Sequence, residues 1–170
     1  AVNEGMLRHA DYQGRCRKEI VLPQVVNGYN VYKADLHTHT IYSDGVALPK
    51  YRVMEAWLDG LDVLSITDHI EFRPHEMAFT EYLEEYMSDQ YKKAVNTNIT
   101  RKAADSNGIL VDLNQTVKDA VKVAADYGIT VIPGAEITRK TEGDFNVLFT
   151  TDNNLIYDPD PVQSVRNAKV

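Results

Sequence analysis

The chain has 170 residues, of which 44% are apolar and 25% are charged, as is typical of one globular domain with a sizeable core. Its formal net charge of −7 argues against a general electrostatic grip on nucleic acid or on an anionic membrane. No apolar run approaches the roughly 18–20 residues of a membrane helix, so we expect no membrane span.

In chain order, residues 1–30 carry no chemistry that we can interpret and form an N-terminal extension, within which 19–26 could add an edge strand. Residues 31–37 predict a strand, because apolar side chains precede a polar segment. Residues 48–60 predict a helix with proline in its first turn and a terminal glycine. Residues 62–69 predict a second strand with polar residues at its end.

In the second half, residues 80–105 predict a polar helix, and 96–113 predict a helix end followed by a loop. The clearest helix is 114–128, which ends at a glycine. Its predicted apolar stripe consists of Val117, Ala120, Val121, Ala124 and Ala125. Residues 129–136 and 144–150 predict two further strands. This alternation favours an α/β domain with parallel strands.

Polar side chains follow the end of each of the first three core strands. They are His37, His39 and Asp44 after the first, Asp68 and His69 after the second, and Glu136 after the third. The carboxyl ends of parallel strands share one face of a sheet, so residues distant in sequence can converge there. Imidazole and carboxylate groups suit zinc, manganese or iron, and two or three such ions could clamp a phosphate and activate water.

Each of these residues alone has a plainer explanation. An isolated pair of histidines is a weak signal, Asp44 before Gly45 suits a turn, and Asp68 suits a helix cap. Glu136 could be a solvated loop residue. Their joint placement at strand ends is what favours a metal site. We interpret His75 as a loop or rim residue.

The motifs DLHTHTIYSDG at 35–45, ITDH at 66–69 and PGAEIT at 133–138 together resemble the PHP (polymerase and histidinol phosphatase) family of metal-dependent phosphoesterases. DFNVLF at 144–149 is similar to the GHFN-type strand of one branch, and the resemblance covers about residues 31 to 150. It implies a distorted (β/α)7 barrel, here its N-terminal part, with a PHP domain over 31–170.

The resemblance implies a role for each site residue. His37 and His39 would bind a first metal with Glu136, Asp44 and His69 would bind a second, and Glu136 would bridge to a third. Asp68 would orient the neighbouring histidine. Arg139 is a candidate contact for a substrate phosphate, with a surface salt bridge as the plainer alternative.

Two departures from the family pattern matter. Asp144 stands where the GHFN motif has histidine, so it either ligates metal with altered preference or marks a lost ligand. The family's later ligand motifs are missing, because no histidine follows His75. Since such a barrel needs roughly 200–250 residues, we expect a fragment, a barrel completed by a second chain, or a reduced fold. An incomplete barrel exposes strand edges, which favours self-association.

The first functional prediction is hydrolysis of a phosphomonoester or phosphodiester by metal-activated water, with a phosphorylated small molecule favoured over nucleic acid as substrate. An amidohydrolase-type metal hydrolase is the second, since it also carries two histidines on a first barrel strand. A non-catalytic metal-binding or assembly module with an incomplete site is the third.

The cellular compartment stays open. The chain begins at Ala1 and shows no signal peptide, which fits a soluble protein, either cytoplasmic or exported after signal removal. The single cysteine, Cys16, lies outside every motif, and we interpret it as structural.

Overall fold

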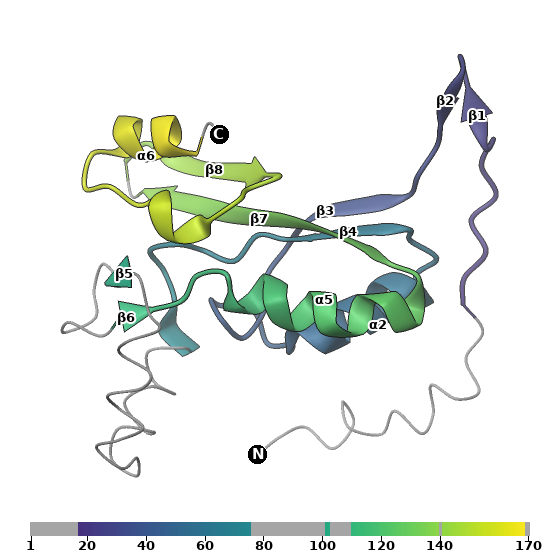
Figure 1. Cartoon of the computed structure of the whole chain (residues 1–170), viewed down its shortest axis with the longest axis horizontal. Helices are drawn as coiled ribbons and strands as arrows, with labels where there is room; N and C mark the ends of the chain where they lie inside the picture. Colours follow the sequence, from purple (N-terminus) through teal and green to yellow (C-terminus); the bar gives the residue numbers. More distant parts are fainter. Residues whose placement is uncertain (1–16, 76–100, 103–109, 140, 169–170) are drawn as a thin grey trace, which may run out of the picture.

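A four-stranded sheet forms the centre of the computed structural model, which describes residues 17–75, 101–102, 110–139 and 141–168. The strand order is β3 (Ala34–Thr38), β4 (Val63–Ile66), β7 (Thr130–Arg139) and β8 (Gly143–Leu148). All four were predicted from the sequence. The sheet is curled, so the α/β class is confirmed, whereas the described residues form a partial barrel and do not close one (Figure 1).

The first three strands run parallel, as predicted, but β8 does not. β3 pairs with β4 and β4 pairs with β7 in parallel, while β8 returns antiparallel to β7. The expectation of parallel strands throughout is therefore wrong for β8. The reason is the short connection between β7 and β8, because a parallel pair needs a crossover of a dozen or more residues.

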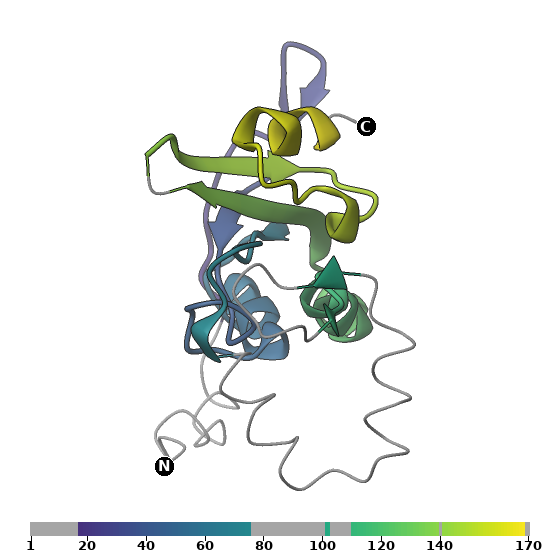
Figure 2. The ribbon, with the colours of Figure 1, turned by 90° about the vertical axis from the view of Figure 1, so that its left-hand side faces the viewer.

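Two crossover helices lie together on one side of the strands, and a third, short helix lies beyond the antiparallel pair β7 and β8, at the opposite end of the view (Figure 2). α2 (Pro49–Leu58) connects β3 to β4, and α5 (Gln115–Tyr127) precedes β7. Both agree with the predicted helices. α5 ends at Gly128, whose φ of 63° is the left-handed conformation expected of a helix C-terminus.

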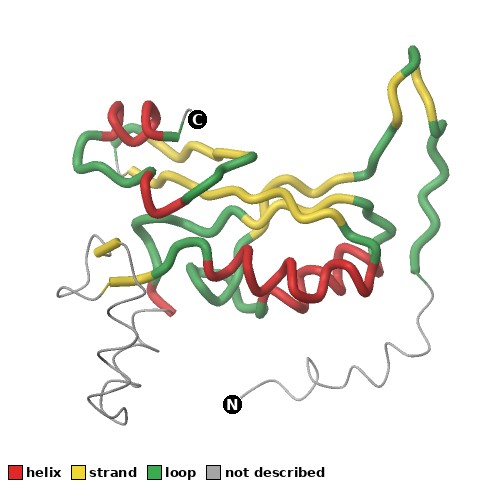
Figure 3. Tube along the Cα trace, in the orientation of Figure 1, coloured by secondary structure: helices red, strands yellow, loops and turns green. Residues whose placement is uncertain are grey.

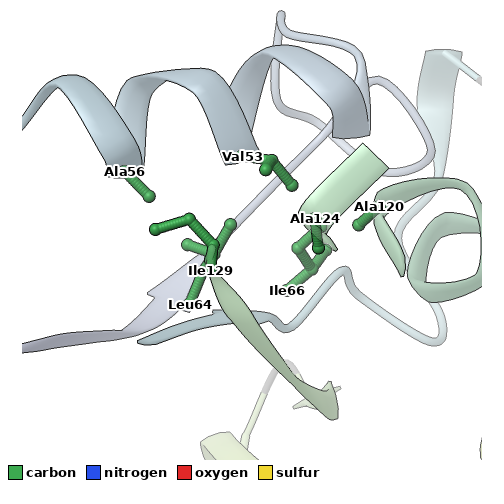
Figure 4. Close-up of a cluster of buried hydrophobic side chains, with 7 residues drawn as sticks. All are labelled: Val53, Ala56, Leu64, Ile66, Ala120, Ala124 and Ile129. Atoms are coloured by element: carbon green, nitrogen blue, oxygen red, sulfur yellow. The ribbon is translucent and has the colours of Figure 1, made fainter. Parts of the chain in front are cut away.

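The main core lies between this helix pair and the sheet (Figure 4). It consists of Val53, Ala56, Leu64, Ile66, Ala120, Ala124 and Ile129. The predicted stripe of α5 was too wide, because Val121 and Ala125 are exposed. Thr116 is buried instead, since its hydroxyl meets that of buried Thr40 at 3.1 Å.

A second core lies farther along β7, under the 3-10 helix η2 (Asn153–Leu155) and α6 (Pro161–Asn167). Its buried members are Ile70, Leu113, Ala135, Ile137 and Ile156. Side chains alternate along β7, so Ala135 and Ile137 enter this core while Glu136 points to the other face. This alternation places an acidic side chain on the inner face of the curled sheet.

The N-terminal segment forms a small hairpin of its own, which projects from the body (Figure 3). β1 (Val25–Val26) pairs with β2 (Tyr29–Asn30) and with no strand of the main sheet, so the expected edge strand over 19–26 does not form among the described residues.

Two short strands replace part of the predicted polar helix and loop. β5 (Arg101–Lys102) pairs antiparallel with β6 (Leu110–Val111), so the helix expected over 80–105 is wrong at its described end, as is the loop expected at 110–111. The rest of that helix, together with Cys16, lies outside the described residues. No helix in the described part of the chain is both long and apolar enough to cross a bilayer.

Candidate metal centre

The polar residues predicted to converge do so where β3 and β4 end, around Glu136, which lies within β7 (Thr130–Arg139) and not after it as predicted. His37 lies in β3, and His39 and Asp44 lie in the loop that follows it. His69 follows β4 and forms a parallel bridge with Glu136 of β7. The bridge brings the main chain of the two strands together, since the amide of Ile70 donates to the Glu136 carbonyl at 2.9 Å.

His39 stands at the centre of the cluster. Its Nδ1 lies 2.7 Å from Oδ1 of Asp44, and its Nε2 lies 2.8 Å from Oε2 of Glu136. The ring centroid of His39 lies 4.9 Å from that of His37 and 4.4 Å from that of His69. His37 and His39, two residues apart in the sequence, therefore both present their rings to the cluster.

His69 completes the arrangement from β4. Its Nδ1 lies 2.6 Å from Oγ1 of Thr138 and 3.1 Å from Oε2 of Glu136, and its Nε2 lies 3.5 Å from Oδ2 of Asp44. His69 and Glu136 are buried, whereas Asp44 is exposed at the mouth of the cluster. One side of the cluster is thus open to solvent, as a hydrolytic site requires.

Two groups of three residues have ligand atoms close enough to share an ion. His37, His39 and Glu136 form one, and His39, Asp44 and His69 form the other; within each group the atoms lie within 4.8 Å of one another. Imidazole nitrogen with carboxylate oxygen is the donor set that zinc, manganese and iron accept. The grouping differs from the implied assignment only in that His39 belongs to both.

Two buried atoms provide a direct test of whether these residues fit a cation. Nε2 of His39 and Oε2 of Glu136 are buried and 2.8 Å apart, yet neither makes a hydrogen bond of acceptable geometry within the described residues. Buried polar atoms normally find partners. A nitrogen and an oxygen that meet without hydrogen-bond geometry fit a shared metal ion, so the residues present suit a divalent cation.

The histidines also change the acidity of Asp44. Partial burial acts to raise the pKa of Asp44, but the hydrogen bond with His39 and the charges of His69 and His39 outweigh it and hold the pKa below its ordinary value. The carboxylate form of Asp44 is therefore favoured, and that is the form that binds a metal.

Asp68 contacts the loop after β3. Its carboxylate is buried and accepts hydrogen bonds of 2.6 Å from the amide of Thr40, the hydroxyl of Thr40 and the hydroxyl of Ser43. This loop connects His39 to Asp44, so Asp68 positions both through the main chain. The sequence analysis missed Thr40 and Ser43, although a buried carboxylate beside the site requires such donors.

Arg139 is held on the outer side of β7. Its guanidinium lies 3.2 Å from Oε1 of Glu71 and donates to the carbonyl of Asp158 and, at 2.8 Å, to the hydroxyl of Ser164. These contacts agree with the plainer alternative of a salt bridge, here half-buried, and they tether the segment that leads into α6.

Asp144 and His75 belong to neither of the two ligand groups found among the described residues. Asp144 is exposed on β8, opposite Thr138 in the register. His75 is exposed, in line with its interpretation as a loop residue.

Three further residues that the sequence analysis missed contact the site histidines. The hydroxyl of Thr67 lies 2.9 Å from Nδ1 of His37, and Thr138 contacts His69 as described above. Arg73 is buried and donates to the main-chain carbonyl of His69 at 2.8 Å. Thr67 and Thr138 each lie two residues from a predicted ligand in the sequence. This spacing is the one feature of the sequence that could have identified them as neighbours of the site.

A PHP domain is recognised over residues 35–159. The chain is similar to the crystal structure of a two-domain protein from Bacteroides vulgatus that contains a predicted PHP-like metal-dependent phosphoesterase. The sequence identity is 33%, the TM-score is 0.67, and the match covers 91% of this chain but only 36% of that one. Another similar structure is a candidate metal-dependent phosphoesterase from Bifidobacterium adolescentis, with 19% identity, a TM-score of 0.38 and coverage of 68% and 26%. No curated protein matches the chain.

Proposed function

The chain belongs to the PHP domain family, and from that premise we propose that it acts as a metal-dependent phosphoesterase that hydrolyses a phosphomonoester or a phosphodiester. The observation that carries the proposal is the buried approach of His39 Nε2 to Glu136 Oε2, 2.8 Å apart without a hydrogen bond of acceptable geometry. The relatives are named as metal-dependent phosphoesterases, and the cluster of this chain fits a metal ion. Both observations support phosphate ester hydrolysis.

The proposed cofactors are two or three divalent ions of zinc, manganese or iron. His37, His39 and Glu136 would hold one, and Asp44 and His69 would hold another, as the two ligand groups support. Bound ions of this kind lower the pKa of a water to about 7 and neutralise charge on a phosphate. Asp144 is proposed as a further ligand, which its exposed position on β8 permits but does not require.

The protein's own residues would position the ligands and receive the substrate. Asp68 holds the loop between His39 and Asp44, so we propose that it acts through these ligands. Arg139 stays a proposal as a phosphate contact, and it could reach a phosphate only by giving up its ion pair with Glu71.

The proposed substrate is a phosphorylated small molecule. The net charge of −7 works against a long polyanion such as nucleic acid, whereas local cations at the site could still receive one phosphate group. We further propose that the curled sheet is the N-terminal part of a distorted (β/α)7 barrel. The chain spans 36% of the length of its Bacteroides relative, so the activity of a whole protein is part of this proposal.

The outer edge of β3 supports self-association. β3 ends the sheet in the described part of the chain, and its residues from Ala34 to His37 are exposed. Exposed strand edges are templates for pairing with another chain. Light scattering coupled to size exclusion would then give a mass above 19.2 kDa, and a monomer would count against this part of the proposal.

One experiment separates the three functions predicted from the sequence. Metal content is measured by elemental analysis, and hydrolysis of p-nitrophenyl phosphate, bis-p-nitrophenyl phosphate and p-nitrophenyl acetate is assayed with added Mn²⁺, Zn²⁺ or Fe²⁺. The variants are His39→Ala and Glu136→Gln. His75→Ala is the matched control, because that histidine is exposed and outside the cluster.

The proposal expects phosphate ester hydrolysis that both site variants lose and the control keeps. Hydrolysis of the acetate alone would instead support the amidohydrolase-type reaction. Bound metal without hydrolysis of any probe would support the non-catalytic module, which the exposed Asp144 outside both ligand groups already favours.

A further inference from the structure

Two threonine hydroxyls touch the same atom of two different site histidines. Oγ1 of Thr67 lies 2.9 Å from Nδ1 of His37, and Oγ1 of Thr138 lies 2.6 Å from Nδ1 of His69. Thr67 comes directly after β4, and Thr138 lies in β7. The third histidine, His39, differs, because both of its ring nitrogens face carboxylates.

A neutral imidazole has one nitrogen that donates and one that accepts, and only the accepting nitrogen can bind a metal. The contact at Nδ1 therefore selects the nitrogen that is left for metal. Histidine ligands generally bond through the second nitrogen to an oxygen that fixes the tautomer and the ring orientation. Oxygens in this position are what Thr67 and Thr138 supply.

The surroundings of Thr67 indicate the direction of its hydrogen bond. Its hydroxyl has a longer contact of 3.4 Å to the carbonyl of Thr38, which can only accept. If the hydroxyl proton points to that carbonyl, the hydroxyl oxygen accepts a proton from Nδ1 of His37. Nε2 of His37 is then left unprotonated.

A separate contact leads to the same tautomer at His69. Its Nδ1 also lies 3.1 Å from Oε2 of Glu136, and a carboxylate oxygen can only accept. A proton on Nδ1 can be donated to the Thr138 hydroxyl. It would also face the negative charge of Oε2, which would repel a lone pair on Nδ1, although this oxygen makes no hydrogen bond of acceptable geometry within the described residues. Nε2 of His69 is then left to face Asp44, at 3.5 Å from Oδ2.

Both threonines are held in place by the fold. The amide of Thr67 donates to the Thr38 carbonyl at 2.9 Å, and a Cβ on Gly134 would lie 2.9 Å from Cγ2 of Thr67, so the side chain is closely packed. The amide of Thr138 donates to Oε2 of Glu71 at 2.9 Å. The fold itself thus anchors both residues through their main chain and packs Cγ2 of Thr67.

We infer that Thr67 and Thr138 are positioning residues whose hydroxyls accept the Nδ1 proton of His37 and of His69 and so direct Nε2 of both rings to metal. The inference rests on the proposed function, because it takes these histidines to be metal ligands. It concerns residues outside the ligand set itself.

The first test needs neither metal nor activity. The wild-type protein, with ¹⁵N-labelled histidine and treated with chelator, is studied by long-range ¹H–¹⁵N NMR at mildly alkaline pH, where the spectrum distinguishes a proton on Nδ1 from a proton on Nε2. We expect protonated Nδ1 for His37 and His69. A proton on Nε2 of both rings would overturn the inference.

The second test measures metal affinity in Thr67→Val and Thr138→Val by competition with a chromogenic chelator, using Zn²⁺ and Mn²⁺. We expect each variant to bind about 10–100-fold more weakly, the usual loss when an oxygen that orients a histidine ligand is removed. Thr67→Ser and Thr138→Ser keep the hydroxyl and should keep most of the affinity. Thr150→Val is the matched control, since its buried hydroxyl has no partner within the described residues.

Unchanged affinity in both valine variants would overturn the inference even if the protein hydrolyses phosphate esters. Conversely, weakened binding in the variants of a protein that hydrolyses no phosphate ester would leave the inference standing and refute only the proposed function. The tautomers of the wild type decide the matter if a valine variant fails to fold.

Discussion

Asp68 provides the sharpest test of how the fold builds the candidate metal centre. The sequence analysis predicts that Asp68 orients the neighbouring histidine. In the structure, the Asp68 side chain instead contacts the loop after β3. Its side chain is 3% exposed, and Thr40 and Ser43, which donate to it, are fully buried. Removing the carboxylate in Asp68→Ala leaves the amide of Thr40 without its acceptor. The hydroxyls of Thr40 and Ser43 keep only longer contacts, to the hydroxyl of Thr116 at 3.1 Å and to Asp44 at 3.4 Å.

The expected loss of stability follows from those three donors. A buried donor left unmatched costs about 1–3 kcal/mol, so three weakened donors predict roughly 3–5 kcal/mol for Asp68→Ala, because the longer hydroxyl contacts and water that enters the vacated space offset part of the sum. Asp68→Asn keeps the volume and one acceptor oxygen, so we expect about 1–3 kcal/mol. Folded domains have only about 5–15 kcal/mol in total, so both losses are measurable by urea denaturation.

The functional consequence separates positioning from chemistry. A loosened loop misplaces His39 and Asp44, so we expect Asp68→Asn to bind Zn²⁺ or Mn²⁺ about 10–100-fold more weakly. Phosphate ester hydrolysis should recover at saturating metal, because the hydrogen bonds of the Asp68 side chain go to Thr40 and Ser43, which are not metal ligands. Asp152→Asn is the control, because the Asp152 carboxylate also holds a loop. It accepts hydrogen bonds from the side-chain amide of Asn114 and from the main-chain amide of Asn154, which lies in η2.

Two results would refute this reasoning. A loss below about 1 kcal/mol for Asp68→Ala would mean that the loop finds other acceptors at little cost. Hydrolysis that stays lost in Asp68→Asn at saturating metal would mean that Asp68 contacts the reacting groups and does not act through the loop alone.

Three more outcomes are expected. Gly134→Ala should destabilise the fold by about 1–3 kcal/mol in urea denaturation, because the added methyl would lie 2.9 Å from Cγ2 of Thr67; an unchanged midpoint would contradict this. Burial acts to raise the pKa of Asp112, but hydrogen bonds with Asn154 and Lys118 outweigh it and lower the pKa below 3.8. Such a carboxylate stabilises the fold above pH 3.8 and loses that effect as the pH falls through the lowered pKa, so Asp112→Asn should reduce the difference in Tm between neutral and acidic pH; an undiminished difference would argue against it. Chelator should lower the Tm measured with saturating Mn²⁺ or Zn²⁺, since an ion at 100 times its Kd adds about 2.7 kcal/mol, and a Tm unaffected by both ions would count against the centre.

The elements that carry the site could be predicted from the sequence because their signals are local. Proline at the start of α2 and glycine after α5 reflect backbone preferences that act within one turn of a helix. The shared carboxyl ends of parallel strands predicted that His37, His39 and Glu136 would converge.

Only the tertiary structure decided which groups meet around those residues. Asp68 was expected to orient its neighbour in sequence, but its hydrogen bonds go to Thr40 and Ser43, more than twenty residues away. Arg139 was a candidate for phosphate, but Glu71 and the segment before α6 surround it. A buried polar side chain bonds to whichever group the packing brings near, and residue type alone does not specify that group.

The antiparallel return of β8 and the short pair of β5 and β6 were likewise beyond local patterns, because a strand's partner and direction depend on the connection and on the rest of the sheet. The sequence by itself therefore determined the class of fold and the ligand types at the candidate metal centre. The contacts that hold those ligands in place were decided by tertiary packing, since they join segments that no local preference brings together.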